Sequence, residues 1–205
     1  PLKDATDAPI VIHAQDAPML QRVSSAAMSF GLTAEDSPPP DQTVADGDEL
    51  TFGNITLKVI HTPGHASDGI VLYNRQTRLL LSSDTLWEHD FPVMTIAVEG
   101  DGAIETMMAS LEKIAGLEVD QVYPGHGAPF DDFQSALQRA TTRLERFQAD
   151  PSRVGWDVIK KIFVYTIMMK RRVAIDTFFD QLMQTDWFPD TVDRYFSRDY
   201  RSIYD

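Results

Sequence analysis

The stretch from residue 55 to residue 73 constrains the fold most, because it places a turn between two strands. Residues 55–60 alternate apolar and polar side chains, and this pattern predicts a half-buried strand. Residues 70–73 predict the next strand. Pro63 and Gly64 lie between them and break any regular ladder. His65 is therefore expected in a loop between rigid strands, where ligands and catalytic groups are commonly placed.

Two later predicted strands also end in residues that can bind a metal. The apolar stretch 78–81 leads to Asp84, and residues 119–123 lead to His126 between two glycines. Imidazole nitrogen and carboxylate oxygen are ligands that suit zinc and similar divalent metals in a hydrolytic site. A single histidine in a turn is more often a surface or hydrogen-bonding residue. Three such positions far apart along the chain indicate a site assembled by a sheet.

These segments together resemble the metallo-β-lactamase superfamily. The resemblance is carried, in chain order, by Thr62-Pro63-Gly64-His65, Ser83-Asp84-Thr85 and Pro124-Gly125-His126-Gly127. Each segment alone is a weak signal, whereas the three in this order are specific. The resemblance extends from about residue 9 to about residue 147. In relatives, the position of Ser83 is usually a glycine, so a close backbone approach at this point is in question.

The resemblance implies a centre of two divalent metal ions. His65 would bind the first metal, His126 the second, and Asp84 would bridge both as the catalytic carboxylate. Zinc is the expected metal, with iron or manganese as alternatives. A metal-held hydroxide would attack the substrate. The segments are most similar to the hydroxyacylglutathione hydrolase (glyoxalase II) type, which favours a small thioester, ester or lactone over a β-lactam.

One part of the family pattern is absent from this sequence. The remaining metal ligands of relatives come from an upstream His-x-His-x-Asp-His motif, and the five histidines of this chain include no such motif. We expect that the chain lacks the N-terminal part of the domain and is not catalytically competent alone. Two alternatives remain open: a non-catalytic, degenerate scaffold of the same fold, or a nuclease or iron redox enzyme of the same superfamily.

The expected fold class is α/β, an incomplete four-layer αβ/βα sandwich over residues 1–150 followed by a helical appendage over residues 151–205. Short strands joined by tight turns predict an antiparallel sheet. Apolar spacing, capping residues and glycine stops predict helices. They are expected from Asp16 to near Gly31, from Asp101 to Gly116, from Asp131-Asp132 past Phe147, over 174–184, and over 189–204. Beyond a boundary at residues 150–152, a further helix is expected to include Val158 to Met168 and to end near residues 170–172.

The segment after Asp84 is expected to overhang the site. Trp87, His89 and Phe91 are its candidate substrate-binding residues, with packing against the loop as an equally good alternative. His13 and His61 are interpreted as structural residues, because the Pro-Gly pair prevents a helical pairing of His61 with His65.

Composition limits the partners. A net charge of −13 argues against nucleic acid or an anionic membrane, since both require clustered positive charge, and a small-molecule substrate is expected instead. The absence of cysteine excludes disulfides and fits a cytoplasmic location. Without an N-terminal half, one apolar face of the sheet would be uncovered, so a dimer or association with a separate N-terminal segment is expected.

Overall fold

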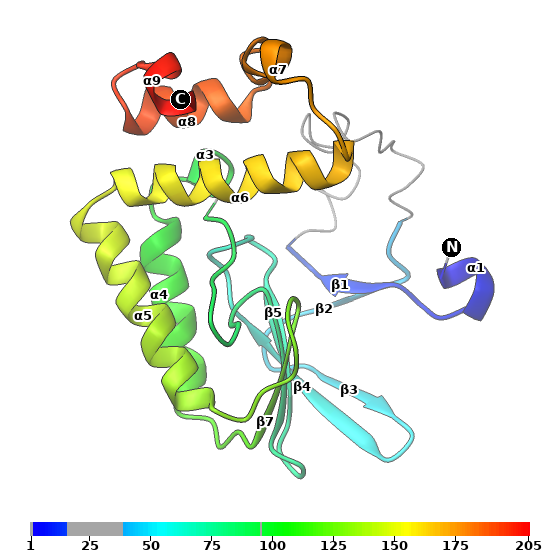
Figure 1. Cartoon of the computed structure of the whole chain (residues 1–205). Coiled ribbons are helices and arrows are strands. Elements are labelled where there is room, and N and C mark those ends of the chain that lie inside the picture. Colours follow the sequence, from blue (N-terminus) through cyan, green and yellow to red (C-terminus); the bar gives the residue numbers. More distant parts are fainter. Residues whose placement is uncertain (1, 16–38, 95) are drawn as a thin grey trace.

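The structure, a computed structural model, describes residues 2–15, 39–94 and 96–205. Within these ranges the strands form two sheets (Figure 1). Strands β1 (Val11–His13) and β2 (Gln42–Val44) make a small parallel pair. The larger sheet has five strands in chain order: β3 (Glu49–Phe52), β4 (Ile55–His61), β5 (Ile70–Asn74), β6 (Leu79–Ser83) and β7 (Gln121–Pro124).

Strand direction in the larger sheet decides where its loops emerge. Each pair from β3 to β6 is antiparallel, which confirms the predicted antiparallel arrangement for these strands, whereas β7 lies parallel to β6. The parallel pair needs a crossover, which the helices between residues 96 and 115 provide. Strands β4, β6 and β7 therefore point the same way, and their C-terminal ends meet at one edge of the sheet.

Helices α3 (Ile96–Glu99), α4 (Ala103–Ala115) and α5 (Phe133–Ala149) lie on one side of the larger sheet (Figure 1). Apolar side chains of β4–β7 pack with α4 and α5 in the main core. The inward residues of α5 are those that helical spacing predicts: Leu137, Leu144 and Phe147. As predicted, Asp132 caps the start of α5, and its carboxylate accepts a hydrogen bond from the Ser135 N–H.

The predicted start of α4 at Asp101 is wrong by one residue. Gly102 is its N-cap and makes no side-chain cap, while Gly116 ends the helix as expected. The carboxylate of Asp101 accepts a hydrogen bond from Arg194 at 2.7 Å instead. Asp101 therefore pairs with Arg194, which is distant in the sequence, and does not cap α4 as the local pattern predicted.

The C-terminal region contains helices α6 (Ser152–Lys170), α7 (Ile175–Leu182), α8 (Trp187–Tyr195) and α9 (Tyr200–Tyr204). A second buried cluster, centred on Ile159, Phe178, Leu182, Phe188 and Val192, holds these helices together. Helix α6 also contributes Val154 and Val158 to the main core, so it belongs to both clusters. No helix in the described ranges combines the length and the apolar character that a membrane span requires.

A single helix over residues 189–204 is a wrong prediction, since α8 and α9 are separated by residues 196–199. Ser197 and Arg198 have positive φ angles of 54° and 68°, which a continuous right-handed helix cannot contain. Asp199 then caps α9 by accepting from the Ser202 N–H. The helix predicted between Asp16 and Gly31 lies outside the described residues.

The two faces of the larger sheet differ in burial. Val71 and Leu80 on the helix side are fully buried, whereas Leu72 and Leu81 on the other side are only half-buried. Tyr123 on this second side is 43% exposed. The association expected on this face stays a prediction.

Gly64 is a position where an added methyl group should be costly. A Cβ built there would lie 2.5 Å from Met107 Cβ, and the φ angle of 138° is unfavourable for side chains. We expect Gly64→Ala to lower the free energy of unfolding by about 2 kcal/mol or more. Urea unfolding followed by circular dichroism measures this change. Gly116→Ala is the matched control because Gly116 has open space and negative φ, and equal losses in both variants would contradict the argument.

Candidate functional site

The candidate residues lie on the loops that leave the common edge of β4, β6 and β7. His65 follows β4, Asp84 follows β6, and His126 follows β7. The sheet therefore brings together three residues that the sequence holds far apart. Their exposed side-chain fractions differ, at 31% for His65, 32% for Asp84 and 69% for His126.

The loop that carries His65 is held by α4 and by the Asp84 loop. The Ser110 hydroxyl donates to the Pro63 carbonyl at 2.6 Å, and Gly64 lets the loop approach Met107 closely. The hydroxyl groups of Thr62 and Thr85 form a buried hydrogen bond of 2.7 Å. This last contact joins the loop after β4 to the loop after β6.

Hydrogen bonding fixes the orientation of the His65 ring. Its Nδ1 lies 2.7 Å from the carbonyl oxygen of Val93, which can only accept, so Nδ1 carries the hydrogen. In the neutral ring Nε2 then carries the lone pair, and it lies 3.7 Å from Asp84 Oδ2. Two electron-rich atoms facing each other at this distance favour a cation between or beside them. A carbonyl that fixes the tautomer in this way is typical of histidines that bind metals.

The other oxygen of Asp84 faces the second histidine. His126 Nε2 lies 3.9 Å from Asp84 Oδ1, and the indole N–H of Trp87 donates to the same oxygen at 3.1 Å. The Trp87 ring also lies against the His126 ring, with centroids 4.9 Å apart. Each carboxylate oxygen is therefore paired with a different imidazole, and Trp87 restricts both Asp84 and His126.

A close backbone approach shapes the site beneath Asp84. A Cβ at Gly125 would lie 2.6 Å from Asp84 Oδ1 and would have to displace this carboxylate, and the Gly125 N–H donates to the Ser83 carbonyl at 2.8 Å. Ser83 adopts a positive φ of 47° to allow this contact. The close backbone approach is therefore present even though residue 83 is serine and not glycine, and the positive φ of Ser83 is the strain that accompanies it.

The donor chemistry of His65, Asp84 and His126 fits one side of a metal centre but does not complete one. Among the residues that the structure describes, no three His, Asp or Glu side chains form a group that could hold a metal ion. The two imidazoles face different oxygens of Asp84, so the three side chains do not converge on one metal position. Further ligands are required for a closed coordination shell.

His13 and His61 occupy structural positions, as interpreted from the sequence. Their rings stack with centroids 4.1 Å apart, and His61 Nε2 lies 2.9 Å from the Ser67 carbonyl. Burial and the neighbouring His61 hold the pKa of His13 below its usual value of 6.5. This stacked pair supports the base of the loop that carries His65.

The three candidate substrate-binding residues have three different environments. Trp87 contacts Asp84 and His126 directly. The side chain of His89 is 76% exposed and lies 3.4 Å from Glu88 Oε2. Phe91 is fully buried in the main core, so it cannot face a substrate. This burial corrects the substrate-binding interpretation of Phe91, and the packing alternative describes that residue.

The comparisons with known proteins agree with this geometry. The family model of the metallo-beta-lactamase superfamily matches residues 1–126. The chain belongs to the metallo-beta-lactamase superfamily. Members of this superfamily generally bind divalent metal ions.

Two curated relatives of this superfamily member are enzymes. An atrochrysone carboxyl ACP thioesterase of Aspergillus fumigatus is 31% identical over 108 residues, which cover 53% of this chain and 32% of that protein. A hydroxyacylglutathione hydrolase of Brucella ovis is 34% identical over 122 residues, covering 55% of this chain and 46% of that protein. The chain thus spans less than half the length of these relatives.

Solved structures of the superfamily share the fold. A metallo-beta-lactamase family protein of Thermus thermophilus aligns with a TM-score of 0.59 and 22% identity, covering 69% of this chain and 55% of that one. A protein solved in a di-iron-bound form aligns with a TM-score of 0.53 and 26% identity, covering 68% and 65%. The α/β class and the superfamily fold predicted from the sequence are confirmed.

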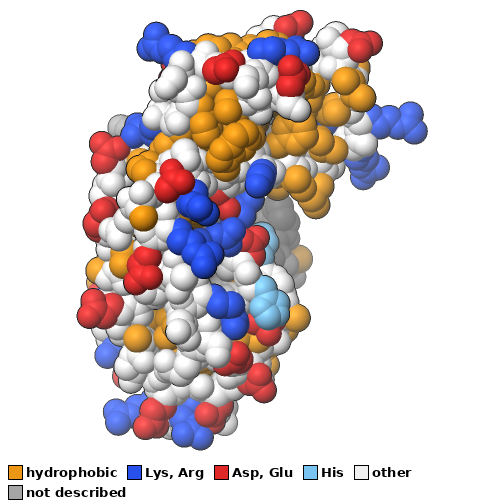
Figure 2. All heavy atoms as spheres, turned by 60° about the vertical axis from the view of Figure 1, so that its left-hand side comes forward, with side chains coloured by type: hydrophobic (Ala, Val, Ile, Leu, Met, Phe, Trp, Pro, Cys, Tyr) orange, Lys and Arg blue, Asp and Glu red, His pale blue; other side chains and the backbone are white. Residues whose placement is uncertain are grey.

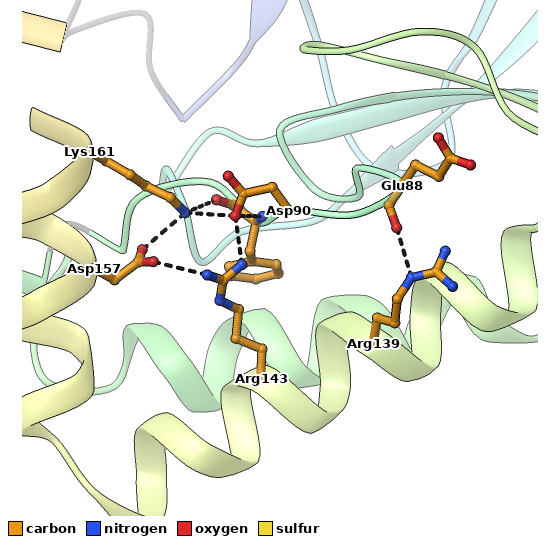
Figure 3. Close-up of polar contacts among 7 residues, drawn as sticks. Glu88, Asp90, Arg139, Arg143, Asp157 and Lys161 are labelled. Carbon is orange, nitrogen blue, oxygen red and sulfur yellow. Dashed lines mark hydrogen bonds and ion pairs between the residues drawn. The ribbon is translucent and has the colours of Figure 1, made fainter. Parts of the chain in front are cut away.

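An ion-pair cluster that the sequence analysis missed holds the loop after Trp87 (Figure 3). Arg143 of α5 lies 2.6 Å from Asp90 Oδ1 and 3.2 Å from Asp157 Oδ1. Lys161 of α6 lies 3.2 Å from Asp90 Oδ1 and 3.0 Å from Asp157 Oδ2, and donates to the Phe91 carbonyl. Asp157 Oδ2 makes no well-aligned hydrogen bond, so its contact with Lys161 is Coulombic. The four-residue spacing of Asp157 and Lys161 was the available sequence signal.

Ser83 offers a direct measurement of the strain in this superfamily member's site. We expect Ser83→Gly to raise the free energy of unfolding by about 0.5–1 kcal/mol, because glycine tolerates the positive φ and the serine side chain is exposed. Ser83→Ala keeps the strain and should change stability by less than about 0.5 kcal/mol. Chemical denaturation of the three proteins provides the comparison, and a glycine variant no more stable than the alanine variant would refute it.

The ion-pair cluster should make the free energy of unfolding fall as the pH is lowered into the acid range. Burial raises the pKa of Asp90, but the Phe91 N–H, Lys161 and Arg143 together outweigh it and hold the pKa below the usual 3.8. A lowered carboxyl pKa stabilises the fold above the unfolded-state pKa, and this contribution is lost as pH falls through the folded-state pKa.

Asp90→Asn should therefore destabilise the protein at pH 7 by up to about 1 kcal/mol, the range for partly exposed pairs. The difference from the parent protein should shrink toward zero as pH falls below about 4. Urea unfolding of both proteins at pH 7 and at pH 3 gives the two differences. Asp180→Asn on α7 is the control, and an Asp90→Asn difference that does not change with pH would count against the cluster.

Proposed function

We propose that this chain carries one side of a two-metal hydrolase centre that acts on a small thioester, with an ester or lactone as less favoured substrates. The observation that carries the proposal is the placement of His65 and His126 at different oxygens of Asp84. This placement would suit Asp84 to lie between two metal ions, one held by each histidine. The names of the two curated relatives, a thioesterase and a hydroxyacylglutathione hydrolase, favour the thioester.

Each residue of the site has a chemical task in this proposal. Divalent metal ions, when bound, supply a water of lowered pKa and polarise the carbonyl group of the substrate. His65 would hold one ion through Nε2, since the Val93 carbonyl occupies Nδ1, and His126 would hold the other. Asp84 would neutralise part of their charge and keep them at a fixed separation, while Trp87 holds Asp84 in position. Because imidazole binds metals only when unprotonated, binding should weaken in acid.

A complete centre requires ligands beyond these three residues. We therefore propose that the chain binds metal weakly alone and that catalysis requires the His-x-His-x-Asp-His ligands of the superfamily pattern. Zinc is the first candidate, and the neighbour solved in a di-iron-bound form supports iron as the second. Elemental analysis of the protein as the gene encodes it distinguishes the two metals.

Substitutions at the site test the hydrolase directly. In a protein that also carries the His-x-His-x-Asp-His ligands, we expect Asp84→Asn and His126→Ala each to lower kcat for release of thiol from an acyl thioester by at least about 100-fold and to reduce the bound metal. Asp180→Asn, an exposed carboxylate far along the chain, should retain full activity. Full activity of Asp84→Asn would refute the proposal. A parent protein that binds metal but cleaves no thioester, ester or lactone would favour the scaffold alternative.

A further inference from the structure

Helices α5 and α6 meet at a corner (Figure 1), and each presents a row of side chains at helical spacing. Positions three or four residues apart lie on one side of a helix. The rows line a groove of about 890 Å³ on the protein surface. They consist of Arg139, Thr142, Arg143 and Arg146 on α5, and of Arg153, Trp156, Asp157 and Lys160 on α6.

The groove has the opposite charge to the rest of the protein. The cations that line it are Arg139, Arg143, Arg146, Arg153 and Lys160, and its carboxylates are Asp150 and Asp157, so the lining carries a net charge of +3. The whole chain carries −13. Figure 2 shows these Lys and Arg side chains gathered near the middle of one face, beside histidine side chains. Such a local concentration of cations in an acidic protein attracts anions into one place.

Two of these cations lack a counter-charge. Arg143 is paired with Asp90 and Asp157, and Arg153 lies 3.3 Å from Asp150. Arg146 and Lys160 are exposed and make no ion pair with any residue in the described part of the chain. Cations repeated at three- and four-residue spacing repel one another. An anion held by Arg146 and Lys160 would remove this repulsion.

An aromatic surface lies beside the unpaired cations. Trp156 is 39% exposed and lies between Arg153 and Lys160 in the α6 row. Its ring is supported from behind by Phe196, with centroids 4.9 Å apart and an interplanar angle of 56°. An indole that is braced on one side and open on the other can stack against a planar base.

We propose that this groove binds an organic phosphate that carries a planar base, that is, a nucleotide or the nucleotide part of a larger ligand. Arg146 and Lys160 hold the phosphates, since guanidinium and ammonium groups bind phosphate oxygens strongly. Trp156 stacks on the base. The volume lies in the range of about 300–1,000 Å³ that small-molecule sites occupy.

The groove also reaches the loop beside the metal site. His89 lines it, and Arg139 donates to the Glu88 carbonyl at 2.9 Å. If the proposed hydrolase function holds, the substrate class is therefore a thioester whose leaving group carries a nucleotide. Its acyl end would extend from His89 along residues 87–89 toward Asp84. This extension rests on the proposed function, whereas nucleotide binding by the groove does not.

Isothermal titration of the full chain with ADP, pyrophosphate and adenosine tests the groove. We expect ADP to bind roughly tenfold more tightly than pyrophosphate, because only ADP offers a base for stacking. Adenosine should show no measurable binding, since it lacks phosphate. Added salt should weaken the binding of both anions. Failure of ADP to bind, or equal affinity for ADP and pyrophosphate, overturns the nucleotide assignment.

Three variants locate the binding. The double variant Arg146→Gln, Lys160→Gln should weaken ADP binding at least tenfold. Lys170→Gln, Arg172→Gln removes the same charge from exposed positions outside the groove and should leave ADP affinity within about twofold, the effect of screened distant charges. Trp156→Leu should weaken ADP but not pyrophosphate, a result that lost folding could not produce. Equal weakening by both double variants would show diffuse attraction and overturn the site.

Thioester assays separate this proposal from the hydrolase function. Faster cleavage of a nucleotide-bearing acyl thioester than of the same acyl group on a simple thiol, with the difference abolished by Arg146→Gln, Lys160→Gln, supports both proposals. Equal cleavage of the two substrates together with no ADP binding overturns the groove and leaves the hydrolase intact. In a protein that also carries the His-x-His-x-Asp-His ligands, ADP binding without cleavage of any thioester supports the groove and contradicts the hydrolase.

Discussion

The shared direction of β4, β6 and β7 is the constraint on which the candidate site depends. Because antiparallel β5 separates β4 from β6, and because β7 returns parallel to β6, three C-terminal strand ends meet at one sheet edge. Each end then has only a few residues in which to place a polar side chain. The site is therefore a product of topology, and local sequence contributes the turns that allow His65, Asp84 and His126 to approach one another.

The turns that carry the three residues depend on glycines, which have no side chain, and on a strained backbone at Ser83. Gly64 admits Met107, Gly125 admits the carboxylate of Asp84, and Ser83 accepts a positive φ so that its carbonyl can receive the Gly125 N–H. None of these arrangements is favourable for an isolated segment. They persist because the strands and helices on either side of these turns are fixed by packing in the main core. These backbone contacts place Asp84 independently of any ligand, and the metal-bridging role proposed for Asp84 would require such a fixed position.

Sequence reasoning succeeded where a local pattern has one physical outcome. Alternation predicted the antiparallel strands, and Asp132 predicted the start of α5, because the relevant contacts are made within a few residues. It failed where a distant residue competes. Arg194 pairs with Asp101 just before α4, and Phe91 packs in the core although Asp90 beside it is exposed. The partner of His65 Nδ1 is a backbone carbonyl, that of Val93, and a sequence gives no signal for such a partner.

The ion-pair cluster joins the C-terminal helix α6 to α5 and to the loop that follows Asp84. Asp157 and Lys161 belong to α6, yet their contacts with Arg143, Asp90 and the Phe91 carbonyl hold the loop that begins with Trp87. The same loop ends at Val93, whose carbonyl orients His65. Helix α6 thus contacts the middle of the segment from Trp87 to Val93. The two ends of this segment contact the two histidines, Trp87 at His126 and Val93 at His65. Arg143 and Asp157 belong both to this cluster and to the lining of the groove between α5 and α6.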